Sequence, residues 1–237
     1  MTGPLPANVS TVLFDLGNTL HHLDHAFIAG VVTRHARPVD AAEVAAAEYH
    51  GKAAVDASFR ARRMGTDASR QRPYFETILG VLGIDESAWP AIGAALRDEN
   101  TRDTLWRVMH DDTPDVLAAL RARGYTLGVV SNADGRAAAS LAACGLTPHL
   151  ATVIDSHVVG VEKPDPRIFE LALAACGAEP EQALFIGDIY EIDIRGARNA
   201  GIAALLLDPL GLYGEVDCDR IDSLSRLLEL LPGCPRR

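Results

Sequence analysis

The chain has 237 residues, of which 48% are hydrophobic and 23% are charged, and its formal net charge is −10. This composition predicts a globular protein of one or two domains and argues against a disordered chain. The negative charge disfavours nucleic acid and anionic membranes as partners.

The first ten residues, MTGPLPANVS, do not show a basic stretch followed by an apolar one, so we predict no signal peptide. No apolar run approaches the roughly 18–20 residues that cross a membrane. The four cysteines have no CxxC or metal-like spacing, which favours reduced thiols. We therefore expect a cytoplasmic protein.

The first predicted element is a short buried strand at residues 11–14, which leads directly into Asp15 and the turn-forming Gly17 and Asn18. The segment from about 21 to 111 has no pattern typical of a strand. Its apolar spacing predicts helices at 40–57, 73–82 and 89–97.

From Pro114 onward, predicted helices and strands alternate. This alternation favours βαβ units, and hence an α/β fold with a parallel sheet covered by helices on both faces. We expect a sheet domain, residues 1–20 and 112–237, interrupted after its first strand by a helical insert at 21–111. The expected strands are 125–130, 152–154, 183–186 and 202–207, and the expected helices are 114–124, a segment ending at 143, 166–176, 192–200 and 223–231.

Four polar residues lie close to the carboxyl ends of predicted strands. Asp15, Ser131 and Asp188 follow strands directly or after one glycine, and Lys163 precedes a predicted helix. The carboxyl ends of parallel strands meet at one edge of a sheet, which is where such sheets bind their ligands. We therefore expect these four side chains to share one pocket.

This set of groups is suited to phosphate-ester hydrolysis. Asp15 can act as the nucleophile, and Asp15 with Asp188 can hold Mg²⁺, which needs few protein ligands. Lys163 supplies a compact positive charge and Ser131 a hydroxyl group. The sequence thus predicts a magnesium-dependent hydrolase of a small phosphorylated metabolite.

Four motifs occur in an order that resembles the haloacid dehalogenase (HAD) superfamily of hydrolases, in particular subfamily I (IA-like) with an α-helical C1 cap. The resemblance covers essentially the whole chain and implies a Rossmann-like core with an inserted, mobile cap domain. The motifs are VLFDLGNTL at 12–20, VVSNADG at 129–135, GVEKPDPRIFELAL at 160–173 and FIGDIYEIDIRGARNAGI at 185–202.

The resemblance implies a role for each motif residue. Asp15 would be the nucleophile and a magnesium ligand, together with Asp188 and the backbone oxygen of Gly17. Lys163 would brace the nucleophile and the phosphoryl group. The remaining roles are phosphoryl contact for Ser131 and Asn132, support of the metal loop for Asp193, and either phosphate binding or a turn hydrogen bond for Thr19.

The first motif departs from the family pattern DxDxT, because Gly17 occupies the place of the second aspartate. That aspartate is the usual general acid and base, and losing such a group lowers the rate by roughly 10²–10⁴. One alternative is therefore a catalytically silent protein that binds a phosphorylated ligand. Another is that one of the nearby histidines, His21, His22 or His25, replaces the acid.

A third alternative is hydrolysis of a C–P or C–halogen bond, in which Lys52 would form a Schiff base with a phosphonate substrate. The competing interpretation of Lys52 is a surface position on a helix. The arginine cluster at Arg60–Arg72 could either clamp an anionic substrate tail or form a solvated helix face. Lys52 and Lys163 are the only two lysines among 22 basic residues. A chain so rich in arginine is expected to retain lysine where a compact point charge is needed.

Overall fold

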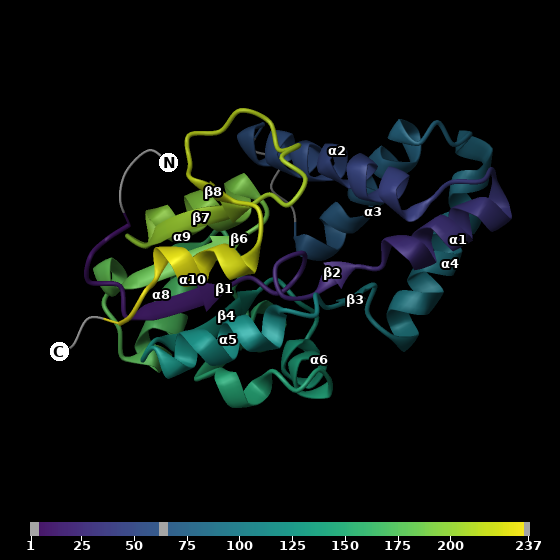
Figure 1. Cartoon of the computed structure of the whole chain (residues 1–237). Helices are drawn as coiled ribbons and strands as arrows, with labels where there is room; N and C mark the ends of the chain where they lie inside the picture. The colour runs from purple at the N-terminus through teal and green to yellow at the C-terminus, as the bar shows by residue number, and fades with distance from the viewer. Residues whose placement is uncertain (1–4, 62–65, 235–237) are drawn as a thin grey trace. The chain divides into compact units, whose positions relative to one another are not determined.

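The computed structural model describes residues 5–61 and 66–234. The chain forms two compact units, coloured by residue number in Figure 1. The sheet unit comprises Met1–His21, Met109–Gly211 and Glu215–Arg237, and the helical unit comprises His22–Val108 and Leu212–Gly214.

Within the described ranges, the sheet unit has six parallel strands in the order β5-β4-β1-β6-β7-β8. With helices on both faces, this arrangement confirms the predicted α/β class (Figure 1). Strand β1 lies between β4 and β6, so the residues that follow these three strands are neighbours. The strands are β1 (Thr11–Phe14), β4 (Thr126–Ser131), β5 (Thr152–Asp155), β6 (Ala183–Gly187), β7 (Ala203–Leu207) and β8 (Arg220–Ile221).

Side-chain alternation along β1 supplies both faces of the sheet. Val12 and Phe14 enter a core that includes helices α5, α6 and α10, whereas Leu13 enters a second core with α8 and α9. In that second core Phe169 packs edge-on against Phe185, with ring centroids 5.1 Å apart. The helices of this unit are α5 (Thr113–Ala122), α6 (Ala137–Ala143), α7 (Ser156–Val159), α8 (Pro166–Cys176), α9 (Arg195–Asn199) and α10 (Leu227–Leu230). A π-helical turn, Tyr190–Ile194, directly precedes α9.

The described residues of the helical unit form four α-helices, and α2 makes extensive contact with α3. Helix α2 begins with a capping box, in which Asp40 and Glu43 each accept a hydrogen bond from the other's backbone N–H. Throughout the described ranges, the helices fall short of the length and apolar character that a membrane span requires. The helices are α1 (His25–His35), α2 (Ala41–Arg60), α3 (Asp67–Val81) and α4 (Trp89–Arg102).

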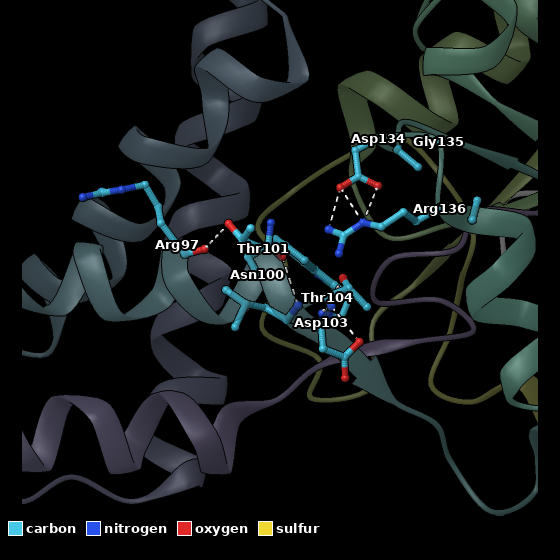
Figure 2. A network of polar contacts seen from close by, with 12 residues as sticks. Arg97, Asn100, Thr101, Asp103, Thr104, Asp134, Gly135 and Arg136 are labelled. Carbon is cyan, nitrogen blue, oxygen red and sulfur yellow. Dashed lines mark hydrogen bonds and ion pairs between the residues drawn. The ribbon is translucent and has the colours of Figure 1, made fainter.

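The end of α4 is fixed by side chains that accept or donate locally (Figure 2). Thr101 Oγ1 donates to the Arg97 carbonyl at 2.9 Å, and Asn100 Oδ1 accepts from the Leu105 N–H at 3.1 Å. These bonds end the helix and lead the chain into the next strand.

The structure corrects two expectations for the insert, on its strands and on its helices. Its described residues contain two strands, β2 (His22–Leu23) and β3 (Trp106–Val108), which pair antiparallel; they are too short to produce a visible alternation. Helix α1 was not predicted, and α3 begins six residues before the predicted start at Pro73, which lies inside the helix. The helical unit also includes Leu212–Gly214 from the far end of the sequence.

Candidate active site

The carboxyl edge of the sheet positions three polar residues. Ser131 is the last residue of β4, Asp15 follows β1, and Asp188 follows β6. The Asp15 N–H donates to the Ile186 carbonyl at 2.8 Å, so the hydrogen-bonded ladder continues to the acid itself. Neighbouring strands therefore present these side chains next to one another.

Three carboxylates form a compact cluster at this edge. One oxygen from each of Asp15, Asp188 and Asp193 lies within 4.8 Å of the others. All three residues are buried, with exposed fractions of 7%, 2% and 2%. Such a group of oxygen ligands is the kind that binds a hard divalent cation.

Lys163 joins the cluster from the segment before α8. Its Nζ donates to Asp15 Oδ1 at 2.5 Å and to Asp193 Oδ1 at 2.7 Å, and the residue is only 2% exposed. Burial alone would lower the pKa of Lys163, but the two carboxylates outweigh burial and raise the pKa above its ordinary value. The ammonium group is therefore charged.

The negative charge of the cluster exceeds what Lys163 neutralises. Burial raises the pKa of Asp15 to about 8; Lys163 opposes the rise, while Asp193 and Asp188 add to it. One ammonium thus faces three carboxylates inside the protein. The donor set and the raised pKa both fit a divalent cation, whose charge would favour the ionised form of Asp15.

Asp193 holds the loop that carries Asp188. Its Oδ2 accepts hydrogen bonds from the N–H groups of Asp188, at 3.1 Å, and Ile189, at 3.0 Å. A Cβ atom at Gly187 would lie 2.5 Å from the Asp193 side chain, so this approach requires glycine. The π-helical turn that contains Asp193 was not predicted, and π-helical turns recur at functional sites.

The structure places the remaining motif residues in different surroundings. Ser131 is 4% exposed, and its hydroxyl makes no hydrogen bond to any residue within the described ranges. Thr19 is fully buried, and its hydroxyl likewise has no partner within those ranges. The Asn132 side chain instead binds the backbone of Lys163. Gly17 forms a backbone bridge with His21, in the turn that follows Asp15.

The three histidines do not form one group. His21 is 1% exposed, its Nδ1 lies 3.0 Å from Ser140 Oγ, and burial lowers its pKa, so the ring is neutral. His22 lies on β2. His25 lies in the helical unit, where its Nε2 is 2.6 Å from Glu48 Oε2.

The turn after β4 is fastened by an aspartate that sequence reasoning missed. Asp155, at the end of β5, accepts hydrogen bonds from the N–H groups of Gly135, Ala137 and His157. Beside it, Asp134 forms a bidentate, exposed ion pair with Arg136 (Figure 2). No sequence signal distinguished Asp155 from an ordinary turn residue.

Lys52 lies inside the helical unit, so the expectation of a surface position is wrong. It is 4% exposed, and its ammonium lies 4.9 Å from the centre of the Tyr49 ring. One turn away is buried Glu48, which also accepts a hydrogen bond from Tyr74. Burial would raise the pKa of Glu48, but Lys52, His25 and Tyr74 lower it to about 2.

The arginine cluster at Arg60–Arg72 contains both exposed and buried side chains. Arg60 and Arg72 are exposed, with side-chain fractions of 54% and 83%, as a solvated face requires. Arg70 is 8% exposed and lies over the Phe59 ring at 5.0 Å. The predicted members Arg62 and Arg63 lie outside the described residues.

The fold and this cluster define an α/β protein with a lysine-braced acidic site at the carboxyl edge of a parallel sheet. The sequence model of a family described as haloacid dehalogenase-like hydrolase matches residues 9–201. The chain belongs to this family, which confirms the resemblance seen in the motifs.

Similarity to individual proteins agrees with this family assignment. The chain is 36% identical over 155 residues to human haloacid dehalogenase-like hydrolase domain-containing protein 3, covering 63% of the chain and 60% of that protein. It is 34% identical over 140 residues to a phosphoserine phosphatase of Thermus thermophilus, covering 59% and 54%. The matches therefore span less than two thirds of these relatives.

A solved structure shows the same fold. The HAD hydrolase YfnB of Bacillus subtilis, determined bound to magnesium, superposes with a TM-score of 0.67 at 19% identity, covering 94% of this chain and 98% of that one.

Proposed function

We propose that this chain is a magnesium-dependent hydrolase of small phosphomonoesters, with Asp15 as the nucleophile. The observation that carries the proposal is the buried contact of Asp15 with Lys163 at 2.5 Å, within the cluster that includes Asp188 and Asp193. The phosphoserine phosphatase among its relatives supports phosphate as the transferred group.

The metal would be held by Asp15 and Asp188, with the backbone oxygen of Gly17 as a further ligand. When bound, Mg²⁺ supplies positive charge for the phosphoryl oxygens and for the ionised nucleophile. Asp193 is already occupied by Lys163 and by two N–H groups, so its role is to support the loop.

In the first step an Asp15 carboxylate oxygen attacks phosphorus, the ester P–O bond breaks, and the leaving alcohol takes a proton. In the second step water attacks the aspartyl-phosphate at phosphorus, which releases inorganic phosphate and restores Asp15. Lys163 neutralises charge on the phosphoryl oxygens. The Ser131 hydroxyl and the Thr19 hydroxyl are available to donate to the same group.

Gly17 provides no carboxyl group to protonate the leaving alcohol. The proton must then come from water, from the substrate or from a histidine, and turnover is attenuated. The same feature supports the second candidate, a silent protein that binds a phosphorylated ligand. An assay of metal-dependent phosphate release distinguishes the phosphatase from the silent protein, because a protein that only binds the ligand releases no phosphate.

The assay is steady-state hydrolysis of p-nitrophenyl phosphate with Mg²⁺ and with EDTA. Asp15→Asn is expected to abolish the magnesium-dependent rate, whereas Asp134→Asn, an exposed aspartate of the same unit, retains it. Equal rates for wild type and Asp15→Asn would eliminate Asp15 as the nucleophile. A panel of phosphorylated metabolites then identifies the substrate.

The remaining assignments stay predictions. They include the core domain at 1–20 and 112–237, the cap domain at 21–111, the C1-cap subfamily and the cytoplasmic location. Hydrolysis of a C–P bond through Lys52 predicts trapping of that lysine by borohydride with an aldehyde phosphonate. Hydrolysis of a C–halogen bond predicts halide release without added metal.

A further inference from the structure

Asn132 and Lys163, 31 residues apart in the sequence, are joined by two hydrogen bonds. The Lys163 N–H donates to Asn132 Oδ1 at 2.7 Å, and Asn132 Nδ2 donates to the Lys163 carbonyl at 3.0 Å. One side-chain amide therefore satisfies both backbone polar groups of the lysine, as a neighbouring strand would.

This pairing matters because Lys163 lies in a turn. The residue is outside every helix and strand, between α7 and α8, so no regular ladder fixes its backbone. Its Nζ must nevertheless remain between Asp15 and Asp193, at 2.5 and 2.7 Å. An error of about 1 Å in such a site lowers rates by about 10².

We propose that Asn132 is a positioning residue that acts on the reaction through Lys163, not with its side chain on the phosphoryl group. The amide oxygen and one N–H of the amide nitrogen are held on the Lys163 backbone, and the Ser131 hydroxyl beside the amide is available for the substrate. The role rests on the proposed phosphatase function, because Lys163 braces the nucleophile only in that reaction.

The chemistry of the pairing selects asparagine. Aspartate has the same shape, but its carboxylate would still accept from the Lys163 N–H and would add a negative charge, whereas leucine has a similar volume, is neutral and can neither donate nor accept. Asn132→Leu therefore removes both hydrogen bonds with little change in volume. Asn199→Leu, at an exposed position on α9, is the matched control.

The first measurement tests the pairing without using activity. The chain has two lysines, so labelling with ¹⁵N-lysine gives two backbone amide signals, from Lys52 and Lys163. Asn132→Leu is expected to shift the Lys163 signal and to speed its hydrogen exchange by about tenfold, because the Lys163 N–H loses its acceptor. The Lys52 signal, in the helical unit, should stay unchanged and is the internal reference. An unchanged Lys163 signal overturns the proposal.

The second measurement is a double-mutant cycle with inorganic phosphate as the probe, read by calorimetry in the presence of Mg²⁺. Asn132→Leu is expected to weaken phosphate binding at least fivefold in the wild-type background, and less than twofold in Lys163→Met, because its effect passes through the lysine. An equal loss in both backgrounds, which direct phosphoryl contact or a general structural role would give, overturns the proposal.

The rate of p-nitrophenyl phosphate hydrolysis completes the test. We expect Asn132→Leu to lower kcat by about 10–100-fold, and Asn199→Leu to leave it unchanged. If the wild-type protein hydrolyses no phosphomonoester while the Lys163 signal still responds, the proposed function is what has failed, and the positioning role is overturned with it. A responsive signal with a wild-type rate in Asn132→Leu overturns the positioning role alone.

Discussion

Binding of Mg²⁺ to the acidic cluster should release a proton from Asp15. Without metal, burial raises the pKa of this carboxyl to about 8, so it is largely protonated at pH 7. A metal ligand must be ionised, so binding displaces that proton. The linkage predicts release of about 0.9 proton per Mg²⁺ at pH 7 and about 0.1 at pH 9.

Calorimetric titration with MgCl₂ measures this number when it is repeated in buffers of different ionisation enthalpy. Asp15→Asn has no titrating carboxyl at this position and should release no proton at pH 7. Asp134→Asn, which alters an exposed carboxylate of the same unit, should release as many protons as wild type. Release that is near zero at pH 7, or that is the same at pH 7 and pH 9, would refute the argument.

The same pKa determines how stability depends on pH in EDTA. The folded pKa of Asp15 lies above the ordinary value of an aspartate, 3.8, so the folded state binds a proton more tightly than the unfolded state. Stability therefore falls as pH rises from about 4 to about 8. Thermal unfolding should show this slope in wild type, a smaller slope with Mg²⁺, and none from this position in Asp15→Asn.

Three further changes have defined outcomes. Gly187→Ala should weaken Mg²⁺ binding at least tenfold in calorimetry, because its Cβ would displace Asp193. Gly17→Asp should raise turnover of p-nitrophenyl phosphate by about tenfold or more, because it supplies the missing acid; Gly17 is not among the glycines with positive φ, so aspartate can adopt its backbone. Glu48→Gln should destabilise the helical unit by about 3–5 kcal/mol in urea unfolding, because it removes a buried negative charge that attracts Lys52 and His25. The contribution of Glu48 should be present above pH 4.5 and lost as pH falls toward 2.

Matched variants make these outcomes specific. Gly214→Ala adds a methyl group in open space and should retain Mg²⁺ affinity. The double variant Asp15→Asn with Gly17→Asp should be inactive, since activity without Asp15 would mean that another group attacks. Glu76→Gln, at a partly exposed carboxylate paired with Arg72, should change stability by less than about 1 kcal/mol; a loss equal to that of Glu48→Gln would contradict the buried-pair argument.

The sheet could be predicted because its strands are almost wholly apolar. The four residues of β1 and the five of β6 are all buried, and each run ends at polar or glycine residues that mark the strand end. Strands β2 and β3 gave no such signal, since they have two and three residues and pair across more than eighty positions. Their existence depends on a long-range contact that no local window contains.

Sequence reasoning grouped Asp15, Ser131, Asp188 and Lys163 because parallel strands end at one edge. The structure places the two acids and the lysine in one cluster and Ser131 at the end of the neighbouring strand β4. It could not give the surroundings of Asp193, because that position depends on a π-helical turn and on the missing side chain at Gly187. The contacts of Asn132 were also inaccessible. The motif predicted a substrate contact, whereas the amide is directed to a backbone 31 residues away.

The two lysines show what composition can indicate about buried charge. In a chain with 22 basic residues, Lys52 and Lys163 are 4% and 2% exposed. Each lies close to a buried carboxylate, Glu48 for the first and Asp15 for the second. A guanidinium has five donors in a rigid plane, and burying it would require partners for all of them, whereas an ammonium needs three and can turn to find them. Lysine is therefore the basic residue that fits a small buried carboxylate site, which explains why a chain otherwise built with arginine retains it at these two positions.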